Sequence, residues 1–234
     1  MKKKYFSDFN PFFLKLLNFN LRIEYIFFNF KNIAFSNSLS FEDLFILYFF
    51  YLKKIFNLNI FFLNTGKIFL NFVNFLNKVY KKYKIKIDIF FPNIFLINKY
   101  IKKYNLNSFY NNIILRKICC LIRKIESYNK IIFNFDLIIT GQRSNRVGCE
   151  GFNFNFDDSR KIIKYNLLYF WDYKDIFYFI EKFNIKINNI YNYGYSSVGC
   201  EPCTKKIFSE DNIRSGRWWW ESFNKSKKEC GLHL

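Results

Sequence analysis

Cysteines are the residues of this sequence whose spacing predicts chemistry most directly. Cys119 and Cys120 are adjacent in a stretch with helical periodicity, and Cys200 and Cys203 form a C-x-x-C pair in a loop that contains Gly and Pro. Four thiolates can hold either one tetrahedral zinc ion or a four-iron cluster. Successive side chains on a helix diverge by about 100°, which favours a cluster with several irons. Two buried cysteines beside an unrelated surface pair are the plainer alternative.

A further cysteine, Cys230, lies near the C-terminus in the string Glu-Cys-Gly-Leu-His. A cysteine in a terminal segment suits a nucleophile that closes over a site better than it suits a structural ligand. Lys227 and Lys228 favour its thiolate form, and Glu229 opposes them. Cys149 has no partner in the sequence, and we interpret it as incidental.

The composition limits the class of protein. The chain has 234 residues, 51% of them hydrophobic, which is enough for one domain with a sizeable core. The net charge of +19 suits an anionic ligand. The lysines are dispersed along the chain, and their number is what a drift of the gene toward AT-rich codons would produce. Both observations argue against nucleic acid as a partner. Apolar runs stay below the ~18 residues of a membrane span. Without a signal-peptide pattern, we expect a cytoplasmic, reducing compartment, where cysteines serve metals or catalysis.

Apolar runs alternate with amphipathic ones along the chain. We predict strands at 32–35, 59–63, 86–91 and 136–139, and helices from 41, from about 67 to 83, at 94–104, at 113–128 and at 173–183. After about residue 190 the regular pattern stops. This rhythm predicts an α/β fold, a mostly parallel sheet flanked by helices, with an irregular C-terminal tail.

Three turns follow predicted strands, at 37–43, 64–67 and 140–146. Parallel sheets bind ligands beyond the carboxyl ends of their strands, and a helix N-terminus there suits a phosphate or sulfate. Taken alone, each of these turns is more often an ordinary connection than a ligand site.

Several strings carry a specific resemblance. They are Gly-Tyr-Ser-Ser-Val-Gly-Cys-Glu-Pro-Cys-Thr at 194–204, Arg-Ser-Gly-Arg-Trp-Trp-Trp-Glu at 214–221, Arg-Lys-Ile-Cys-Cys-Leu-Ile-Arg-Lys at 116–124, Leu-Asn-Thr-Gly at 63–66 and Ile-Thr-Gly-Gln-Arg at 139–143. From about Ala34 to His233 the chain resembles the assimilatory adenosine 5′-phosphosulfate (APS) reductases. The resemblance implies an adenine nucleotide alpha-hydrolase-like fold. Residues 1–193 would be the nucleotide-binding part, and 194–234 the second cluster loop and catalytic tail of the same domain.

The resemblance also implies a two-step reaction. The Cys230 thiolate attacks the sulfate sulfur, AMP leaves, and thioredoxin then releases sulfite from the cysteine thiosulfonate. A [4Fe-4S] cluster would be held by Cys119, Cys120, Cys200 and Cys203. The residues expected at the substrate are Lys124, Arg143, Arg214, Arg217, Gly141, Thr65, Gly66 and Asp43. Cations around the sulfate would lower the barrier, typically by ~3 kcal/mol for one contact, although Arg214 and Arg217 could also be a solvated basic loop. Assembly into a homo-oligomer stays open.

The chain departs from the family pattern at several positions. Phe41 replaces a small residue and is expected to narrow the pocket, Asn64 replaces an aspartate, and Gly151 falls where an arginine is usual. Two rival functions are disfavoured by the motifs. The related 3′-phosphoadenosine 5′-phosphosulfate (PAPS) reductases lack the cluster cysteines, all four of which are present here. A tRNA thiolase would need a Ser-Gly-Gly-x-Asp-Ser loop, which this sequence does not contain. Two more remain open on sequence alone, namely a basic nucleic-acid-binding protein with a structural metal site and an inactive remnant of a reductase.

Overall fold

The computed structural model describes residues 11–144, 153–157, 160–208 and 213–221. Its centre is a six-stranded sheet in the order β3-β2-β1-β4-β6-β5. The strands are β1 (Ile33–Ser36), β2 (Asn59–Leu63), β3 (Asp88–Phe90), β4 (Leu137–Thr140), β5 (Phe154–Asp157) and β6 (Ile162–Asn166). Every neighbouring pair is parallel except β5 with β6. The prediction of a mostly parallel sheet is confirmed.

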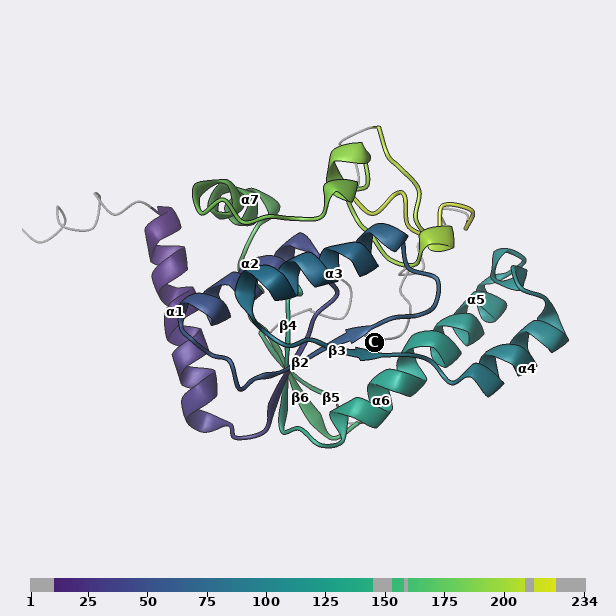
Figure 1. Cartoon of the computed structure of the whole chain (residues 1–234), viewed down its shortest axis with the longest axis horizontal. Coiled ribbons are helices and arrows are strands. Elements are labelled where there is room, and N and C mark those ends of the chain that lie inside the picture. The colour runs from purple at the N-terminus through teal and green to yellow at the C-terminus, as the bar shows by residue number, and fades with distance from the viewer. Residues whose placement is uncertain (1–10, 145–152, 158–159, 209–212, 222–234) are drawn as a thin grey trace, which may run out of the picture.

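Helices cover both faces of this sheet (Figure 1). The larger core lies under α1 (Pro11–Asn29), α2 (Phe41–Leu52), α3 (Leu70–Tyr83) and α7 (Tyr173–Lys182), and α6 (Glu126–Ile132) covers the opposite face. Side chains of a strand alternate between faces, so Ile33 and Phe35 enter the larger core and Ala34 the smaller one. The helices α4 (Ile94–Tyr104) and α5 (Ile113–Cys120) lie at one end of the molecule.

The helix α2 is buried almost along its whole length, as its apolar sequence predicts. Its Phe45 ring packs 5.2 Å from the ring of Phe19 and 5.0 Å from that of Trp171. The Ser40 side chain caps the helix by accepting a hydrogen bond from the backbone N–H of Asp43 at 3.3 Å. Packing and cap together fix the turn that joins β1 to α2.

The predicted helix at 113–128 is helical but not uniform. Between α5 and α6 the chain makes a π-helical turn, Leu121–Ile125, which has wider i→i+5 hydrogen bonding and is frequent at functional sites. The helix α1 precedes the first element that the sequence pattern predicted. Among the described residues, no helix combines the length and apolarity needed to cross a bilayer.

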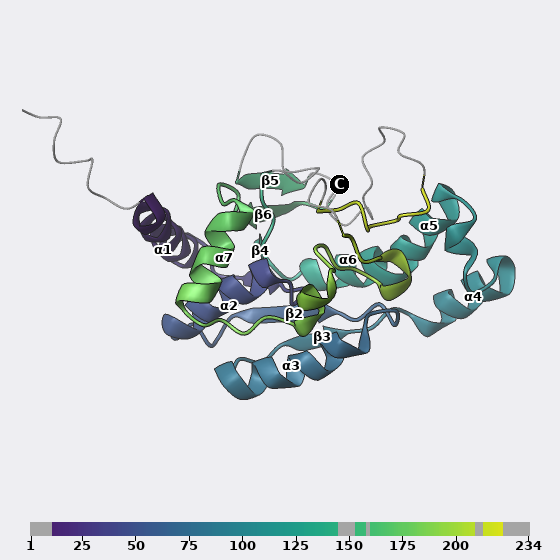
Figure 2. The same cartoon turned by 90° about the horizontal axis from the view of Figure 1, so that it is seen from above.

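The chain after α7 is irregular, as predicted. Among the described residues, short 3₁₀ turns occur at Ser108–Tyr110, Asn189–Tyr193 and Glu201–Cys203, and the last two lie in this segment. An antiparallel bridge joins Thr204 to Arg217. Figure 2 shows the segment after α7, in yellow-green, running back across the molecule toward α5 and α6.

Candidate active site

A cavity of about 150 Å³ opens beyond the carboxyl ends of β1 and β2. Side chains from the turns after these two strands line one side of it, among them Ser38, Ser40 and Thr65, and residues 198–200 with Arg214 and Arg217 line the other. The strand order reverses beside β1, because β2 and β3 lie on one side of it and β4 on the other. Such a switch point is where open α/β sheets bind ligands.

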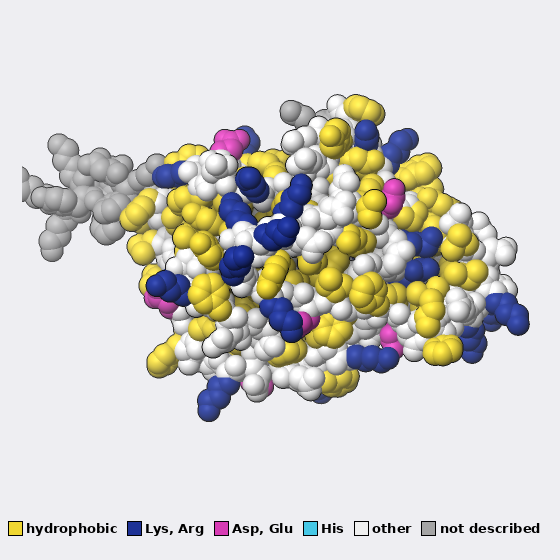
Figure 3. All heavy atoms as spheres, viewed as in Figure 1, with side chains coloured by type: hydrophobic (Ala, Val, Ile, Leu, Met, Phe, Trp, Pro, Cys, Tyr) yellow, Lys and Arg dark blue, Asp and Glu magenta, His cyan; other side chains and the backbone are white. Residues whose placement is uncertain are grey.

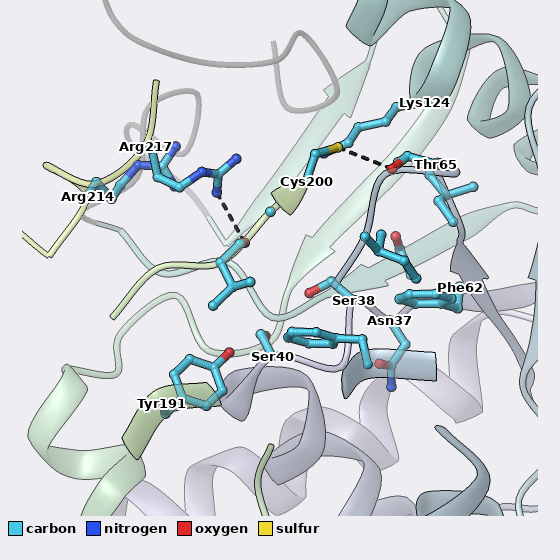
Figure 4. Close-up of a pocket in the computed structure, with 16 residues that line it drawn as sticks. Asn37, Ser38, Ser40, Phe62, Thr65, Lys124, Tyr191, Cys200, Arg214 and Arg217 are labelled. Atoms are coloured by element: carbon cyan, nitrogen blue, oxygen red, sulfur yellow. Dashed lines mark hydrogen bonds between the residues drawn. The ribbon is translucent and has the colours of Figure 1, made fainter. Parts of the chain in front are cut away.

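Three basic side chains gather at one end of this cavity (Figure 4). Lys124 comes from the π-helical turn, and Arg214 and Arg217 come from the C-terminal segment. The Arg217 guanidinium donates to the carbonyl of Val198 at 3.2 Å. A Cβ atom placed on Gly199 would lie only 2.3 Å from the Nη2 atom of Arg217. The absence of a side chain on Gly199 therefore lets the guanidinium lie this close to the backbone. This end of the cavity is suited to an anion.

The other end of the cavity is polar and aromatic. Ser38, Ser40, Phe62 and Tyr191 line it (Figure 4). The carboxylate of Asp43 holds the turn by accepting hydrogen bonds from the Ser38 backbone N–H at 2.7 Å and from its hydroxyl at 2.6 Å. Asp43 therefore positions the lining residues and does not line the cavity itself in the described structure.

A buried corner beside the cavity contains other residues predicted at the substrate. The Arg143 Nε atom lies 3.4 Å from Glu42 Oε1, and both side chains are nearly inaccessible. A Cβ on Gly141 would lie 2.4 Å from Asp43 Oδ1, so the two turns are in close contact. Within the described chain Arg143, Gly141 and Gly66 do not line the cavity, and their contact with substrate stays a prediction.

The four predicted metal ligands line a second, smaller cavity. All four are free thiols, and only Cys200 is partly exposed. The neighbours Cys119 and Cys120 pack against different side-chain clusters, as their helical divergence predicts, yet both reach this cavity. In the C-x-x-C turn the Cys203 N–H donates to the Cys200 carbonyl at 2.9 Å, which brings the loop cysteines opposite the helix.

Cys200 and Lys124 line both cavities. The Cys200 sulfur lies 3.2 Å from the Thr65 hydroxyl oxygen, which places Thr65 at the shared wall (Figure 4). Burial opposes ionisation of Cys200, but Lys124, the Thr65 hydrogen bond and Arg217 outweigh it and lower the pKa of this thiol. By contrast, burial raises the pKa of Cys119, and burial with the nearby Cys200 raises that of Cys203 to about 12.

Arg123 is a site residue that the sequence reasoning missed. Its guanidinium is buried, donates to the Thr65 carbonyl at 2.8 Å and hydrogen-bonds the Cys119 thiol. It therefore ties the turn after β2 to the cysteine helix. The signal was present, because Arg123 stands four residues after Cys119, about one helical turn further along the same face.

A buried ion pair fastens the C-terminal segment to the cysteine helix. Arg116 Nε and Glu221 Oε1 are 2.5 Å apart, Nη2 and Oε2 are 3.3 Å apart, and the guanidinium lies 4.6 Å from the centre of the Trp218 ring. Trp218 is only 1% exposed, so its buried ring also holds this segment in place.

Two sequence expectations have different outcomes. Phe41 does not line the cavity in the described structure, because its ring packs among Tyr173, Phe177 and Tyr191. The expected narrowing by Phe41 is therefore wrong. Cys230, Cys149 and Gly151 lie outside the described residues, so the role of Cys230 as nucleophile stays a prediction.

Comparisons with known proteins agree on one family. Residues 32–206 match the family described as phosphoadenosine phosphosulfate reductase domain. The chain is 36% identical over 204 residues to an adenosine 5′-phosphosulfate reductase of Burkholderia cepacia, covering 86% of this chain and 80% of that protein. It is 34% identical to the enzyme of that name from Neisseria meningitidis serogroup B, covering 87% and 82%.

A solved structure shows the same fold. The phosphoadenylyl-sulfate reductase of Candida auris, in a phosphate complex, superimposes with a TM-score of 0.66 at 18% identity, covering 85% of this chain and 98% of that one. A yeast FAD synthetase aligns with a TM-score of 0.56, covering 86% of this chain and 70% of that one. Because the family match extends from β1 past the C-x-x-C turn, the chain belongs to the phosphoadenosine phosphosulfate reductase family.

Proposed function

We propose that this protein reduces APS to sulfite and AMP, with thioredoxin as electron donor, in cytoplasmic sulfate assimilation. The observation that carries the proposal is the wall shared by the two cavities. On one side Lys124, Arg214 and Arg217 surround space for an anion, and on the other side four cysteines face one another. Relatives named as APS reductases support the choice of substrate.

In the first step the Cys230 thiolate attacks the sulfate sulfur. A sulfur–sulfur bond forms, the bond from that sulfur to the phosphate oxygen breaks, and AMP leaves with the electron pair. The enzyme then carries a thiosulfonate. Lys124, Arg214 and Arg217 would stabilise the negative charge that grows on the leaving phosphate, and a fixed contact of this kind is worth ~3 kcal/mol.

In the second step a thioredoxin thiolate attacks the Cys230 sulfur and displaces sulfite. The mixed disulfide that forms is resolved by the second thioredoxin thiol, which returns Cys230 to its reduced form. Two thiols are oxidised to one disulfide, and these two electrons account for the reduction of sulfate to sulfite. The chain's own part is to hold the anion while the nucleophile attacks.

The donor set fits a [4Fe-4S] cluster held by Cys119, Cys120, Cys200 and Cys203. In the described chain no three His, Cys, Asp or Glu side chains are grouped closely enough for a single metal ion, whereas the four thiols surround one cavity. The buried indole N–H of Trp220, which packs beside these cysteines, has no hydrogen-bond partner among the described residues. An acceptor such as a cluster sulfide would satisfy it.

With four cysteines at its four corners the cluster would supply a structural and electrostatic link between helix and loop, with no open iron. Arg123 and Lys124 would orient the surrounding wall. Since metal ligation needs thiolates, the raised pKa values of Cys119 and Cys203 imply that a bound cluster would displace a proton from each of these thiols.

The test is sulfite release from APS by anaerobically purified protein with reduced thioredoxin. Cys230→Ser should abolish sulfite formation, and Cys149→Ser, the matched control, should retain it. Cys203→Ser should lower bound iron and sulfide and the absorbance near ~400 nm. Sulfite formation by Cys230→Ser, or faster turnover of the 3′-phosphorylated substrate, would contradict the proposal. A protein with cluster and no sulfite formation would favour the inactive remnant.

A further inference from the structure

A further cavity, of about 510 Å³, lies on the face of the sheet that α6 covers. It is larger than the candidate active site, at about 150 Å³, and falls within the range of roughly 300–1,000 Å³ that is usual for ligand pockets. The neighbours Phe61 and Phe62 point to opposite faces of β2, and Phe61 lines this cavity while Phe62 lines the candidate active site. The two cavities are therefore separate.

The route of the chain leaves this cavity open. The helix α6 packs Tyr128 and Ile132 toward the central strands β1 and β4, and after β3 the chain enters α4, which lies with α5 at one end of the molecule. The sheet edge at β3 is left partly bare, and the Phe90 side chain is 38% exposed. The Ser127 hydroxyl donates to the Phe91 carbonyl at 3.2 Å. This bond fixes α6 to the end of β3, so the cavity between them is preformed.

The walls of the cavity are aromatic. Four phenylalanine side chains line it, namely Phe61, Phe90, Phe91 and Phe135. Phe61 is buried, and its ring meets that of Phe90 edge-on, with the ring centres 6.3 Å apart. The faces of aromatic rings carry negative electrostatic potential, and they attract an ammonium group that comes within about 6 Å.

The charges of the lining also favour a cation. Among the described residues that line the cavity, Asp88 and Glu126 are acidic and only Lys130 is basic. Glu126 already pairs with Lys130, and Asp88 pairs with Lys86 at 2.8 Å. On the face that Figure 3 shows, where Figure 1 places β3 and α6, acidic side chains stand beside basic ones next to exposed hydrophobic side chains.

This balance is the reverse of that in the candidate active site. The whole chain has a net charge of +19, and three cations line the candidate active site, whereas the lining here is net negative. An anion would find only a lysine that Glu126 already holds. An ammonium group would be attracted both by the carboxylates and by the ring faces.

We propose that this cavity binds a small organic amine that has one positive charge and an aromatic or branched apolar body. The body lies among the phenylalanine rings, and the ammonium group lies beside Asp88 and Glu126. The assignment makes no use of the proposed reduction of APS, because the cavity shares no described lining residue with the candidate active site.

Ligand-observed NMR titration of the full-length holoprotein at neutral pH tests this proposal. The probes are phenethylamine, phenethyl alcohol and hydrocinnamate, which have similar shapes and are cationic, neutral and anionic. We expect phenethylamine to bind with a Kd of about 1 mM or lower. The alcohol should bind at least about fivefold more weakly, and the anion more weakly still.

Two variants locate the bound amine. Glu126→Gln and Phe91→Ala should each raise the Kd for phenethylamine by about fivefold. The matched controls are Glu24→Gln, whose carboxylate also pairs with a lysine but does not line the cavity, and Phe133→Ala, whose exposed ring does not line it either. Both controls should leave the Kd unchanged, and circular dichroism checks that each variant folds.

Four results would overturn the proposal. They are no binding of phenethylamine up to ~10 mM, equal affinities for the amine and the alcohol, equal losses in the variants and their controls, and displacement of the amine by APS, which would place it in the candidate active site. None of them depends on sulfite formation, so the amine site and the proposed reaction can fail independently.

Discussion

Replacing Arg116 with glutamine should loosen the segment that carries Arg214 and Arg217 from the helix that carries Cys119 and Cys120. The Arg116 and Glu221 side chains are only 3% and 7% exposed, and they meet through two parallel contacts of 2.5 and 3.3 Å. Paired contacts of this kind between arginine and a carboxylate are among the strongest polar interactions in proteins.

The expected loss follows from that burial. Removing one partner of a buried ion pair leaves the other charge uncompensated and costs about 3–5 kcal/mol. Glutamine keeps some packing over Trp218, so we expect about 3 kcal/mol for Arg116→Gln and a similar loss for Glu221→Gln. Arg116→Met combined with Glu221→Leu leaves neither charge of the pair buried, and should cost much less than the two single losses added together.

Urea unfolding followed by circular dichroism measures these losses as changes in the free energy of unfolding. The matched control is Lys86→Gln, because the pair of Lys86 with Asp88 is largely exposed, at 83% and 44%, and its loss should leave the urea midpoint unchanged. Substrate affinity should fall in Arg116→Gln and recover in part in the double variant. A loss below about 1 kcal/mol, or strictly additive single losses, would refute the view that this ion pair fastens the segment.

Three further predictions concern glycine contacts and a buried phenol. Gly199→Ala should weaken APS binding while leaving the urea midpoint nearly unchanged, because its Cβ would meet the movable Arg217 guanidinium at 2.3 Å; an unchanged Kd for APS would contradict this. Gly216→Ala should instead lower the midpoint itself, since its Cβ would lie 2.2 Å from the backbone carbonyl oxygen of Lys205. Burial raises the pKa of Tyr83 to about 12, so the folded state keeps a proton that the unfolded chain releases near pH 10. The stabilisation is complete below about pH 10 and is lost as the pH rises through about 12, a loss of about 1.4 kcal/mol at pH 11. Tyr83→Phe should remove that component, and equal alkaline losses in both proteins would exclude it.

The strands were predictable because short apolar runs end at turn-forming residues. Asn59–Leu63 was predicted with its observed bounds, and so was Ile94–Tyr104. The π-helical turn was not, since hydrophobic periodicity records which side chains are buried and does not fix the hydrogen-bond ladder. The helix α1 was missed as well, because its apolar residues lie on two sides and blur the single-face periodicity that marks an amphipathic helix.

The site shows the same division between local and distant information. Lys124, Arg214 and Arg217 were predicted from motifs, and the fold brings them to one cavity. The pairing of Arg116 with Glu221 joins residues 105 positions apart, which no local pattern encodes. Arg143 lies in a matching motif, yet its guanidinium is buried against Glu42.

The π-helical turn at Leu121–Ile125 is in effect a one-residue insertion in a continuous helix. This turn changes the rotation of α6 about the helix axis relative to α5. As a result Tyr128 and Ile132 of α6 face the sheet, while the cysteines of α5 face the loop. If the same residues wound as a uniform α-helix, one half would be rotated by about 100° relative to the other, so that only one of the two faces could keep its partner. The wider turn thus lets one continuous helix serve the sheet with one half and the cysteine site with the other.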